Sequence, residues 1–301
     1  MKNILIAGGS GFLGSELKTH FKQNGHTVFV LTRNPKLKND LYWCPDNKKI
    51  QLKELKKIEI IINLCGANLA QKKWRKKRKK TLINSRVDPT EFLYQNKEKF
   101  PALEHYIGVS GVNCFGNTND QKVYTETDSF GQDFLSSLVK KWEAAHFLFT
   151  KEFATTILRL PIVLSKNKGM LKRMEFSFSR GFGSVLGNGN QIMNWISCQD
   201  LKRAFTHVIE RKTLGTFQLC ASNTCNKEFS TALAKSMNKK IFLPNTPVWV
   251  LKLILGEMHT LLVNGNYIST EKFMKTNFHY QQMDINDVFT KTYPNKQSNR
   301  T

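Results

Sequence analysis

The sequence is poor in acidic residues and lacks the cysteine and histidine patterns that hold metal ions. Its 301 residues include 46 lysines and arginines but only 23 aspartates and glutamates, so the formal net charge is +23. None of the six cysteines forms a CxxC pair and none of the seven histidines forms an HxxxH pair. Because the common zinc spacings are absent, we predict no metal site and reduced, buried thiols.

The sequence also has no apolar run long enough to span a bilayer and no signal peptide. Its most apolar helix candidate, residues 247–263, is interrupted by Lys252, Glu257 and His259, whereas a span needs about twenty apolar residues. The apolar run at the N-terminus is only one strand long and leads directly into a glycine turn, unlike a secretory leader. These absences predict a soluble, cytoplasmic protein with no membrane partner.

The excess of positive charge is spread along the chain, with one dense run at residues 72–80. Such a run is compatible with a phosphate-binding face or with nucleic-acid binding. It is also typical of the solvated side of a helix, here with Trp74, Leu82 and Ile83 on the buried side. Because lysines recur throughout the sequence, we favour the solvated face and do not expect nucleic acid as a partner. Whether the run binds anything stays open.

The first 33 residues follow the order strand, glycine-rich turn, helix, strand, arginine. In such a unit Gly8 allows the tight turn, Gly11 lets the backbone approach a pyrophosphate, and Gly14 lets the helix pack closely on the strand. The N–H groups at the start of the helix then face the phosphates. The alternative is a glycine-rich turn without a ligand. The predicted contacts of a dinucleotide in this turn are Gly8, Ser10, Gly11, Phe12, Leu13 and Gly14.

The end of the second strand indicates which dinucleotide is bound. An NAD site usually has Asp or Glu there, which holds the ribose 2′-hydroxyl. This chain has Thr32-Arg33-Asn34 and no acid. The planar guanidinium of Arg33 suits a 2′-phosphate, so the sequence predicts NADP(H) as the cofactor. The alternative is a solvated arginine in a very basic protein.

Further strand and helix signals alternate in the way that βα units require. Strands are predicted at residues 59–64, 105–110, 155–160 and 216–220, and helices at 73–95 and 133–150. We therefore predict an α/β fold, a Rossmann-type doubly wound parallel sheet, over residues 1–225, with segments on the substrate side from about 165. A small, mainly helical C-terminal domain is expected over 226–293, followed by a frayed tail over 294–301.

These pieces, in this order and spacing, resemble the atypical extended branch of the short-chain dehydrogenase/reductase superfamily, the epimerase-family proteins with a C-terminal domain of unknown function. The glycine spacing G-x-x-G-x-x-G is one part of the resemblance. The other pieces, in chain order, are Leu31-Thr32-Arg33, Asn63-Leu64-Cys65-Gly66-Ala67, Trp74, Ser85-Arg86, Ser110, Tyr124-Thr125-Glu126, Trp142-Glu143, Leu158-Arg159-Leu160, Gly187-Asn188-Gly189, Trp195-Ile196, Asp200-Leu201, Asn226–Phe229 and Leu255–Met258. The resemblance covers nearly the whole chain.

The resemblance implies a bound NADP(H) and a substrate cleft between the sheet edge and the C-terminal part. Superfamily members often dimerise through helix pairs, so a homodimer is one alternative for the assembly. The further residues that the comparison with this family places beside the cofactor are Cys65, Gly66, Ala67, Arg86, Ser110, Pro161 and Val163.

The catalytic residues of the superfamily are only partly present. A typical member uses a Tyr-x-x-x-Lys pair and a serine, and the lysine lowers the pKa of the tyrosine so that it can act as an acid or base. Here Lys141 stands in the expected helix, but Ser137 takes the place of the tyrosine. We predict Ser110 and Lys141 as catalytic residues, with a plain strand-end serine and a solvated helix lysine as the alternatives.

Other polar residues have two open interpretations. Glu126 and Asp128 suit acid–base chemistry but also turns and caps. Asp200 is expected to cap the helix that follows it, and Trp195 either lines the cleft or fills the core. The chain is thus predicted to be an NADP(H)-binding, epimerase-like oxidoreductase for an unidentified small substrate, nucleotide-linked or anionic. The alternative is a non-catalytic NADP(H)-binding protein with a redox-sensing or regulatory role, so whether it is an enzyme stays open.

Overall fold

The structure, a computed structural model, describes residues 1–51, 54–116 and 121–294. From residue 295 on, the predicted frayed tail lies outside the described residues. The chain forms two compact units. Unit 1 consists of Met1–Cys114, Phe134–Arg159 and Lys202–Phe217, and unit 2 consists of Phe115–Asp133, Leu160–Leu201 and the chain from Gln218.

Unit 1 is built on an eight-stranded sheet in the order β11-β8-β6-β5-β1-β2-β3-β4. Strand β1 pairs in parallel with both β2 and β5, so the strand order reverses at β1. This reversal is the switch point at which doubly wound sheets bind ligands, and the predicted fold class is confirmed. The strands are β1 (Asn3–Ala7), β2 (Thr27–Thr32), β3 (Asp40–Cys44), β4 (Lys49–Ile50), β5 (Ile60–Asn63), β6 (His105–Gly111), β8 (Ala154–Leu160) and β11 (Gly215–Gln218).

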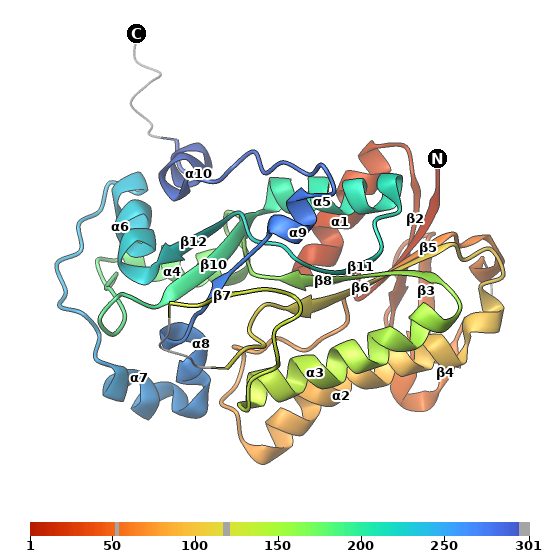
Figure 1. The fold of residues 1–301 in the computed structure, drawn as a ribbon, viewed down its shortest axis with the longest axis horizontal. Helices are drawn as coiled ribbons and strands as arrows, with labels where there is room; N and C mark the ends of the chain where they lie inside the picture. Colours follow the sequence, from red (N-terminus) through yellow and green to blue (C-terminus); the bar gives the residue numbers. More distant parts are fainter. Residues whose placement is uncertain (52–53, 117–120, 295–301) are drawn as a thin grey trace, which may run out of the picture. The chain divides into compact units, whose positions relative to one another are not determined.

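Helices cover both faces of this sheet (Figure 1). Helices α2 (Lys76–Gln95) and α3 (Phe134–Phe147) lie side by side on one face, and α1 (Phe12–Gln23) lies on the other with α5 (Cys198–Arg211). The side chains of His20 and Thr206 join α1 to α5 with a hydrogen bond of 2.8 Å. Because both faces are covered, the central strands are continuous apolar runs, and Ile61 and Ile62 of β5 are fully buried.

Unit 2 contains two small sheets and most of the C-terminal helices. One sheet has the order β12-β10-β9, and β13 pairs in parallel with β7. Among the described residues no helix is long and apolar enough to cross a bilayer. The strands are β7 (Val123–Tyr124), β9 (Ile162–Leu164), β10 (Ile192–Ser197), β12 (Ser222–Cys225) and β13 (Tyr267–Ile268). The helices are α4 (Gly169–Ser179), α6 (Asn226–Ser236), α7 (Val248–Leu255), α8 (Thr260–Val263), α9 (Glu271–Met274) and α10 (Ile285–Thr292).

Two local predictions in unit 2 are wrong. The apolar helix candidate over 247–263 is divided after α7, because Gly256 has a φ of +61° that ends a right-handed helix. Asp200 lies in the first turn of α5 and not before it, and the residue directly before the helix, Ser197, accepts a hydrogen bond from the Asp200 N–H through its hydroxyl. The Asp200 carboxylate instead accepts hydrogen bonds from the backbone N–H groups of Gln281 and Gln282, so it fastens the chain segment before α10.

Candidate functional site

The glycine turn after β1 has the geometry of an anion cradle. Gly8 has a φ of +77°, and the Gly11 N–H closes the turn by donating to the Gly8 carbonyl oxygen at 3.1 Å. A Cβ on Gly14 would lie 2.4 Å from the Gly9 Cα, so no larger residue fits there. Helix α1 begins after Gly11 without a side-chain cap. Its first N–H groups and the positive end of its dipole are therefore available to phosphate oxygens.

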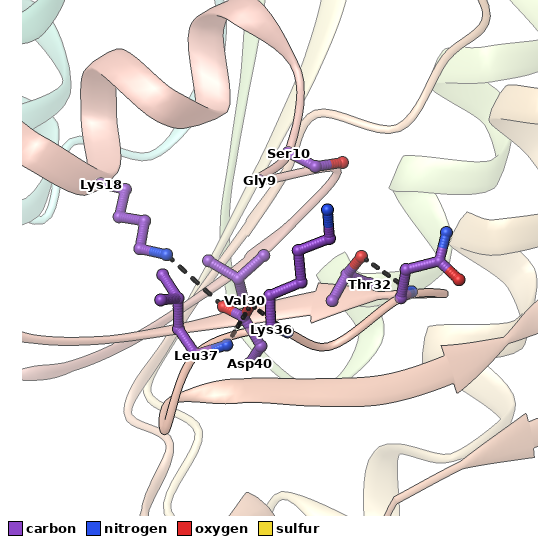
Figure 2. A pocket seen from close by; sticks show the side chains of 9 residues that line it. Gly9, Ser10, Lys18, Val30, Thr32, Lys36, Leu37 and Asp40 are labelled. Carbon is purple, nitrogen blue, oxygen red and sulfur yellow. Dashed lines mark hydrogen bonds and ion pairs between the residues drawn. The ribbon is translucent and has the colours of Figure 1, made fainter.

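A cavity of about 480 Å³ opens beside this turn. Figure 2 shows the Lys36 side chain extending from the segment after β2 toward Ser10. The Asp40 carboxylate, in contrast, is already engaged: it accepts from the backbone N–H groups of Lys36 and Leu37 and pairs with Lys18 at 3.4 Å. The lining residues are Gly9, Ser10, Lys18, Val30, Thr32, Asn34, Lys36, Leu37 and Asp40.

The charge state of Asp40 follows from these contacts. Its partial burial raises its pKa, but the two N–H groups and the Lys18 charge outweigh that effect and bring the pKa below the ordinary value. Asp40 is therefore a carboxylate whose charge is already balanced within the protein. Lys36 supplies positive charge on the side of the cavity that faces the glycine turn. Neither lysine was predicted from the sequence, although Lys36 stands only three residues after Arg33.

Arg33 itself is exposed and is not among the residues that line the cavity. Its charge acts on the thiol of Cys65, which follows β5. Burial raises the pKa of Cys65 to about 12, and the charges of Arg33 and Arg86 oppose this rise. Strands β2 and β5 both pair in parallel with β1, so their carboxyl ends lie at the same edge of the sheet. The role of Arg33 at the cofactor stays a prediction.

Helix α2 holds the Cys65–Ala67 loop at the end of β5. The Ala67 N–H donates to the Ser85 hydroxyl at 2.9 Å, and the Arg86 Nη2 donates to the Ala67 carbonyl at 3.1 Å. A Cβ on Gly66 would come within 3.0 Å of the Arg86 Cζ. A larger residue at this position would therefore have to push the guanidinium aside by a few tenths of an ångström.

Arg86 is a buried cation that has no carboxylate partner among the described residues. Its Nη1 donates to the Leu82 carbonyl, and its guanidinium lies 4.8 Å from the centre of the Trp142 ring. Its Nε is buried and has no hydrogen-bond partner in the described part of the chain. Burial lowers the pKa of Arg86 to about 10. A buried positive charge with a donor to spare favours an anion nearby.

Ser110 lies near the end of β6, in a buried group of three polar side chains. Its hydroxyl donates to Glu143 Oε1 at 2.6 Å, and Arg159 binds both oxygens of the same carboxylate, at 2.8 and 2.9 Å. All three residues are buried. The sequence argument missed Glu143 and Arg159 as partners of Ser110, although the motifs Trp142-Glu143 and Leu158-Arg159-Leu160 were present.

The structure does not bring Lys141 to Ser110. Lys141 is exposed on α3, as is Ser137 one turn earlier. Glu143, which meets Ser110, stands two residues beyond Lys141 and hence on nearly the opposite side of the helix. The catalytic assignment of these two residues stays a prediction, and the contact it would need is not formed.

The remaining candidates lie in unit 2. Val163 is buried and pairs with Ile196 of β10, and Pro161, directly before β9, is half-buried. Trp195 is fully buried and its Nε1 donates to the Thr224 hydroxyl, which makes it a core residue. Among the described residues no group of three or more His, Cys, Asp or Glu side chains could hold a metal ion.

The two acidic residues after β7, Glu126 and Asp128, both accept hydrogen bonds from backbone N–H groups. Glu126 accepts a hydrogen bond of 2.8 Å from the Gln218 N–H. Asp128 accepts from both the N–H and the hydroxyl of Thr125 and pairs with Lys122. The interpretation as a turn residue therefore has direct contacts in its favour for Asp128, whereas Glu126 accepts from a residue 92 positions later in the sequence.

Comparison with known proteins identifies the family. The sequence model of the NAD dependent epimerase/dehydratase family matches residues 4–220, and that of a domain of unknown function, DUF1731, matches residues 246–291. The chain belongs to this NAD(P)-binding epimerase family, and the resemblance inferred from its motifs is confirmed.

Individual relatives match over most of their length. An epimerase family protein of Mycobacterium leprae is 34% identical over 260 residues, which cover 84% of this chain and 83% of the relative. One of Mycobacterium bovis is 36% identical over 251 residues, 81% of this chain and 83% of the relative. The crystal structure of human epimerase family protein SDR39U1 with NADPH is similar at a TM-score of 0.88 and 25% identity, covering 97% of this chain and 99% of that chain.

Proposed function

We propose that this protein binds NADP(H) in preference to NAD(H) and acts as an oxidoreductase on a small, anionic substrate. The observation that carries the proposal is the cavity beside the glycine turn, where Lys36 extends toward Ser10 while the acid Asp40 is already bound to Lys18 and two N–H groups. Such a site offers positive charge to a 2′-phosphate and no spare carboxylate to a ribose 2′-hydroxyl.

The surrounding residues fit the rest of the cofactor. The turn from Gly8 to Gly14 would hold the pyrophosphate, and Arg33 and Lys36 would flank the 2′-phosphate. The loop of Cys65, Gly66 and Ala67, with Arg86 beneath it, would border the cofactor at the end of β5. When bound, the nicotinamide supplies or accepts a hydride. The human relative whose structure contains NADPH supports this choice of dinucleotide.

Ser110 is the residue best prepared to hold a substrate. Its proton is donated to Glu143, which Arg159 fixes through two hydrogen bonds. The Ser110 oxygen therefore keeps its lone pairs for a donor, such as the hydroxyl of an alcohol substrate. A net charge of +23 would favour the approach of anionic molecules.

A second candidate function is NADP(H) binding without catalysis, for example in redox sensing. It is favoured by one observation: Ser137 replaces the tyrosine of the superfamily, and Lys141 is exposed on the side of α3 away from Glu143. No phenol is then available from this helix to act as the acid or base.

Titration with NADPH and NADH tests the cofactor assignment. For Lys36→Ala and for Arg33→Ala we expect the affinity for NADPH to fall about tenfold or more, the usual effect of losing a charged hydrogen bond, with little change for NADH. Lys38→Ala is the matched control for Lys36→Ala, because Lys38 is an exposed lysine of the same segment that does not line the cavity. Equal affinities of the wild type for NADPH and NADH would refute the proposal.

The two candidate functions differ in hydride chemistry. An oxidoreductase should oxidise NADPH in the presence of some member of a panel of anionic carbonyl compounds, and Ser110→Ala should lower this rate by more than any loss of NADPH affinity accounts for. NADPH binding with no oxidation across the panel would favour the non-catalytic protein.

A further inference from the structure

Helix α7 carries apolar side chains on the outside of unit 2. Only Leu251 of its eight residues is buried, and Lys252 is its single charged residue. Trp249 is 68% exposed and Ile254 is 57% exposed, and Leu253 is exposed as well. A helix that is apolar on all sides is normally buried, so an apolar surface of this kind indicates an interaction site.

The segment directly before α7 also exposes apolar side chains. Phe242 is 79% exposed, and its neighbour Leu243 is also exposed. The segment is not loosely attached, because the Thr246 N–H donates to the Val185 carbonyl and the Thr246 carbonyl accepts from the Gly187 N–H, both at 2.8 Å. We refer to these exposed side chains of α7 and of the segment before it together as the apolar patch: Phe242, Leu243, Trp249, Leu253 and Ile254.

The charged residues in the chain segment that carries the apolar patch are all positive up to residue 256, and the nearest acid after it is the exposed Glu257. No Asp or Glu occurs from residue 229 to residue 256, whereas this stretch contains four lysines. Lys239, Lys240 and Lys252 are exposed. Lys252 lies three and four residues from Trp249 and Val248 and hence on their side of α7. Aromatic and aliphatic side chains bordered by lysines are typical of helices that lie on a membrane surface, where the lysines reach the headgroups.

We propose that the apolar patch docks on an anionic lipid bilayer, with α7 lying in the plane of the headgroups. The net charge of +23 complements the negative surface of such a bilayer. A second copy of the chain fits less well. A two-fold interface would bring the same patch of both copies together, and with it Lys239, Lys240 and Lys252 of two strongly positive molecules.

This docking does not conflict with the lack of a spanning helix. An eight-residue helix is far too short to cross a bilayer, but a helix that lies on the surface needs no such length. The expectation of no membrane partner depended on the missing span, and it is replaced here by surface docking. The inference is independent of the cofactor and of the proposed reaction.

The tryptophans provide a direct readout. Trp43, Trp74, Trp142 and Trp195 are at most 8% exposed, so a change in emission on binding reports on Trp249. The full-length protein is mixed with vesicles of phosphatidylcholine alone or of an equimolar mixture with phosphatidylglycerol. With the anionic vesicles we expect co-sedimentation, a blue shift of emission, and quenching by brominated acyl chains; with the neutral vesicles we expect much weaker binding.

Substitutions distinguish binding through the apolar patch from a general attraction of the positively charged protein to anionic lipid. Trp249→Gln and Ile254→Asn should each lower the affinity for anionic vesicles about tenfold, since each removes an apolar anchor. Leu214→Asn, at an exposed leucine of unit 1, is the matched control and should bind as the wild type does. Replacing Lys239, Lys240 and Lys252 by Gln should weaken binding about fivefold per lysine, more than the same change at Lys72, Lys76 and Lys77.

Three results would overturn the proposal. The first is the absence of binding to anionic vesicles at low salt. The second is unchanged binding by Trp249→Gln together with loss of binding in the Lys72, Lys76 and Lys77 variant, which would indicate attraction through the basic run alone. The third is a stable dimer in sedimentation equilibrium that Trp249→Gln converts to a monomer, which would assign the apolar patch to a second copy.

Discussion

Unit 1 contains two buried arginines, and their positive charges are balanced in different ways. Arg159 donates two hydrogen bonds to the Glu143 carboxylate, one to each oxygen, and the Ser110 hydroxyl donates to Oε1 of the same carboxylate. Arg86 has backbone carbonyls and the Trp142 ring but no carboxylate among the described residues. The first charge is neutralised within the fold, whereas the second is left in excess.

The difference indicates which of the two is structural and which is available to a ligand. The charge of Arg159 is already balanced by the Glu143 carboxylate, which it binds through two nitrogens, so an added anion would gain little there. A buried guanidinium beneath a loop at the switch point of the sheet, with an unsatisfied Nε, gains from an anion bound nearby. The comparison therefore assigns Arg159 to the support of Ser110, and it favours Arg86 as a residue that tunes the cofactor loop.

The largest expected effect comes from breaking the buried ion pair. Glu143→Leu or Arg159→Met alone should lower the free energy of unfolding by about 3–5 kcal/mol, because the partner charge is left buried and uncompensated. The double variant should recover most of that loss. Urea unfolding measures all three. As a control, Glu271→Gln removes an exposed ion pair with Lys275 and should have no measurable effect. Additive losses in the double variant would contradict this account.

A third buried basic residue, His146, differs from both arginines because it is uncharged at neutral pH. His146 Nε2 donates to the Val109 carbonyl at 3.0 Å, which leaves Nδ1, 2.7 Å from the Tyr106 oxygen, to accept the phenolic proton. Burial lowers the pKa of His146 to about 4, against a weaker opposing effect of the Val109 carbonyl. The folded protein therefore binds this proton less readily than the unfolded chain does.

The sign of the pH dependence follows. The contribution of neutral His146 to the free energy of unfolding is fully present above the pKa of the unfolded chain, about 6.5. It is lost as the pH falls from there toward 4. Between pH 7 and pH 5 this group should remove about 2 kcal/mol from the free energy of unfolding. In His146→Gln the difference between the two pH values should shrink by that amount, as measured by urea unfolding at both. An unchanged difference would show that folding does not lower the pKa of His146.

The smallest effect on stability is expected at Arg86. Arg86→Met removes hydrogen bonds to Leu82 and Ala67 but also removes a buried charge without a carboxylate, so the net loss should be about 1 kcal/mol. The affinity for NADPH should fall, and Arg86→Lys should restore part of it. A loss of stability as large as that of Arg159→Met would mean that the excess charge is balanced within the fold after all.

Much of the sheet and of the cofactor turn could be predicted from local sequence. The strand at Asn3–Ala7, the glycines at 8, 11 and 14, and the strand at Thr27–Thr32 follow from apolar periodicity and from backbone constraints that act over a few residues. Strands β3 and β4 were missed: β4 has only two residues, and β3, unlike β1, is not a continuous apolar run, since exposed and buried residues alternate along it.

The partners of the candidate residues could not be predicted in the same way. Glu143 meets Ser110 across 33 positions of sequence and Arg159 across 16, and no local pattern specifies such contacts. Asp40 illustrates the limit. A sequence argument that looks for a free acid near β2 cannot see that this carboxylate is held by Lys18, 22 positions earlier.

Each unit consists of separate stretches of the chain, and this affects how unit 1 folds during synthesis. The last strand of the large sheet, β11, has four residues and is followed by the final stretch of unit 2. Until those four residues are made, β8 has an unpaired edge, and open strand edges invite pairing with other chains. Co-translational folding of unit 1 thus remains incomplete through more than two thirds of synthesis, and closing this edge is a late and vulnerable step.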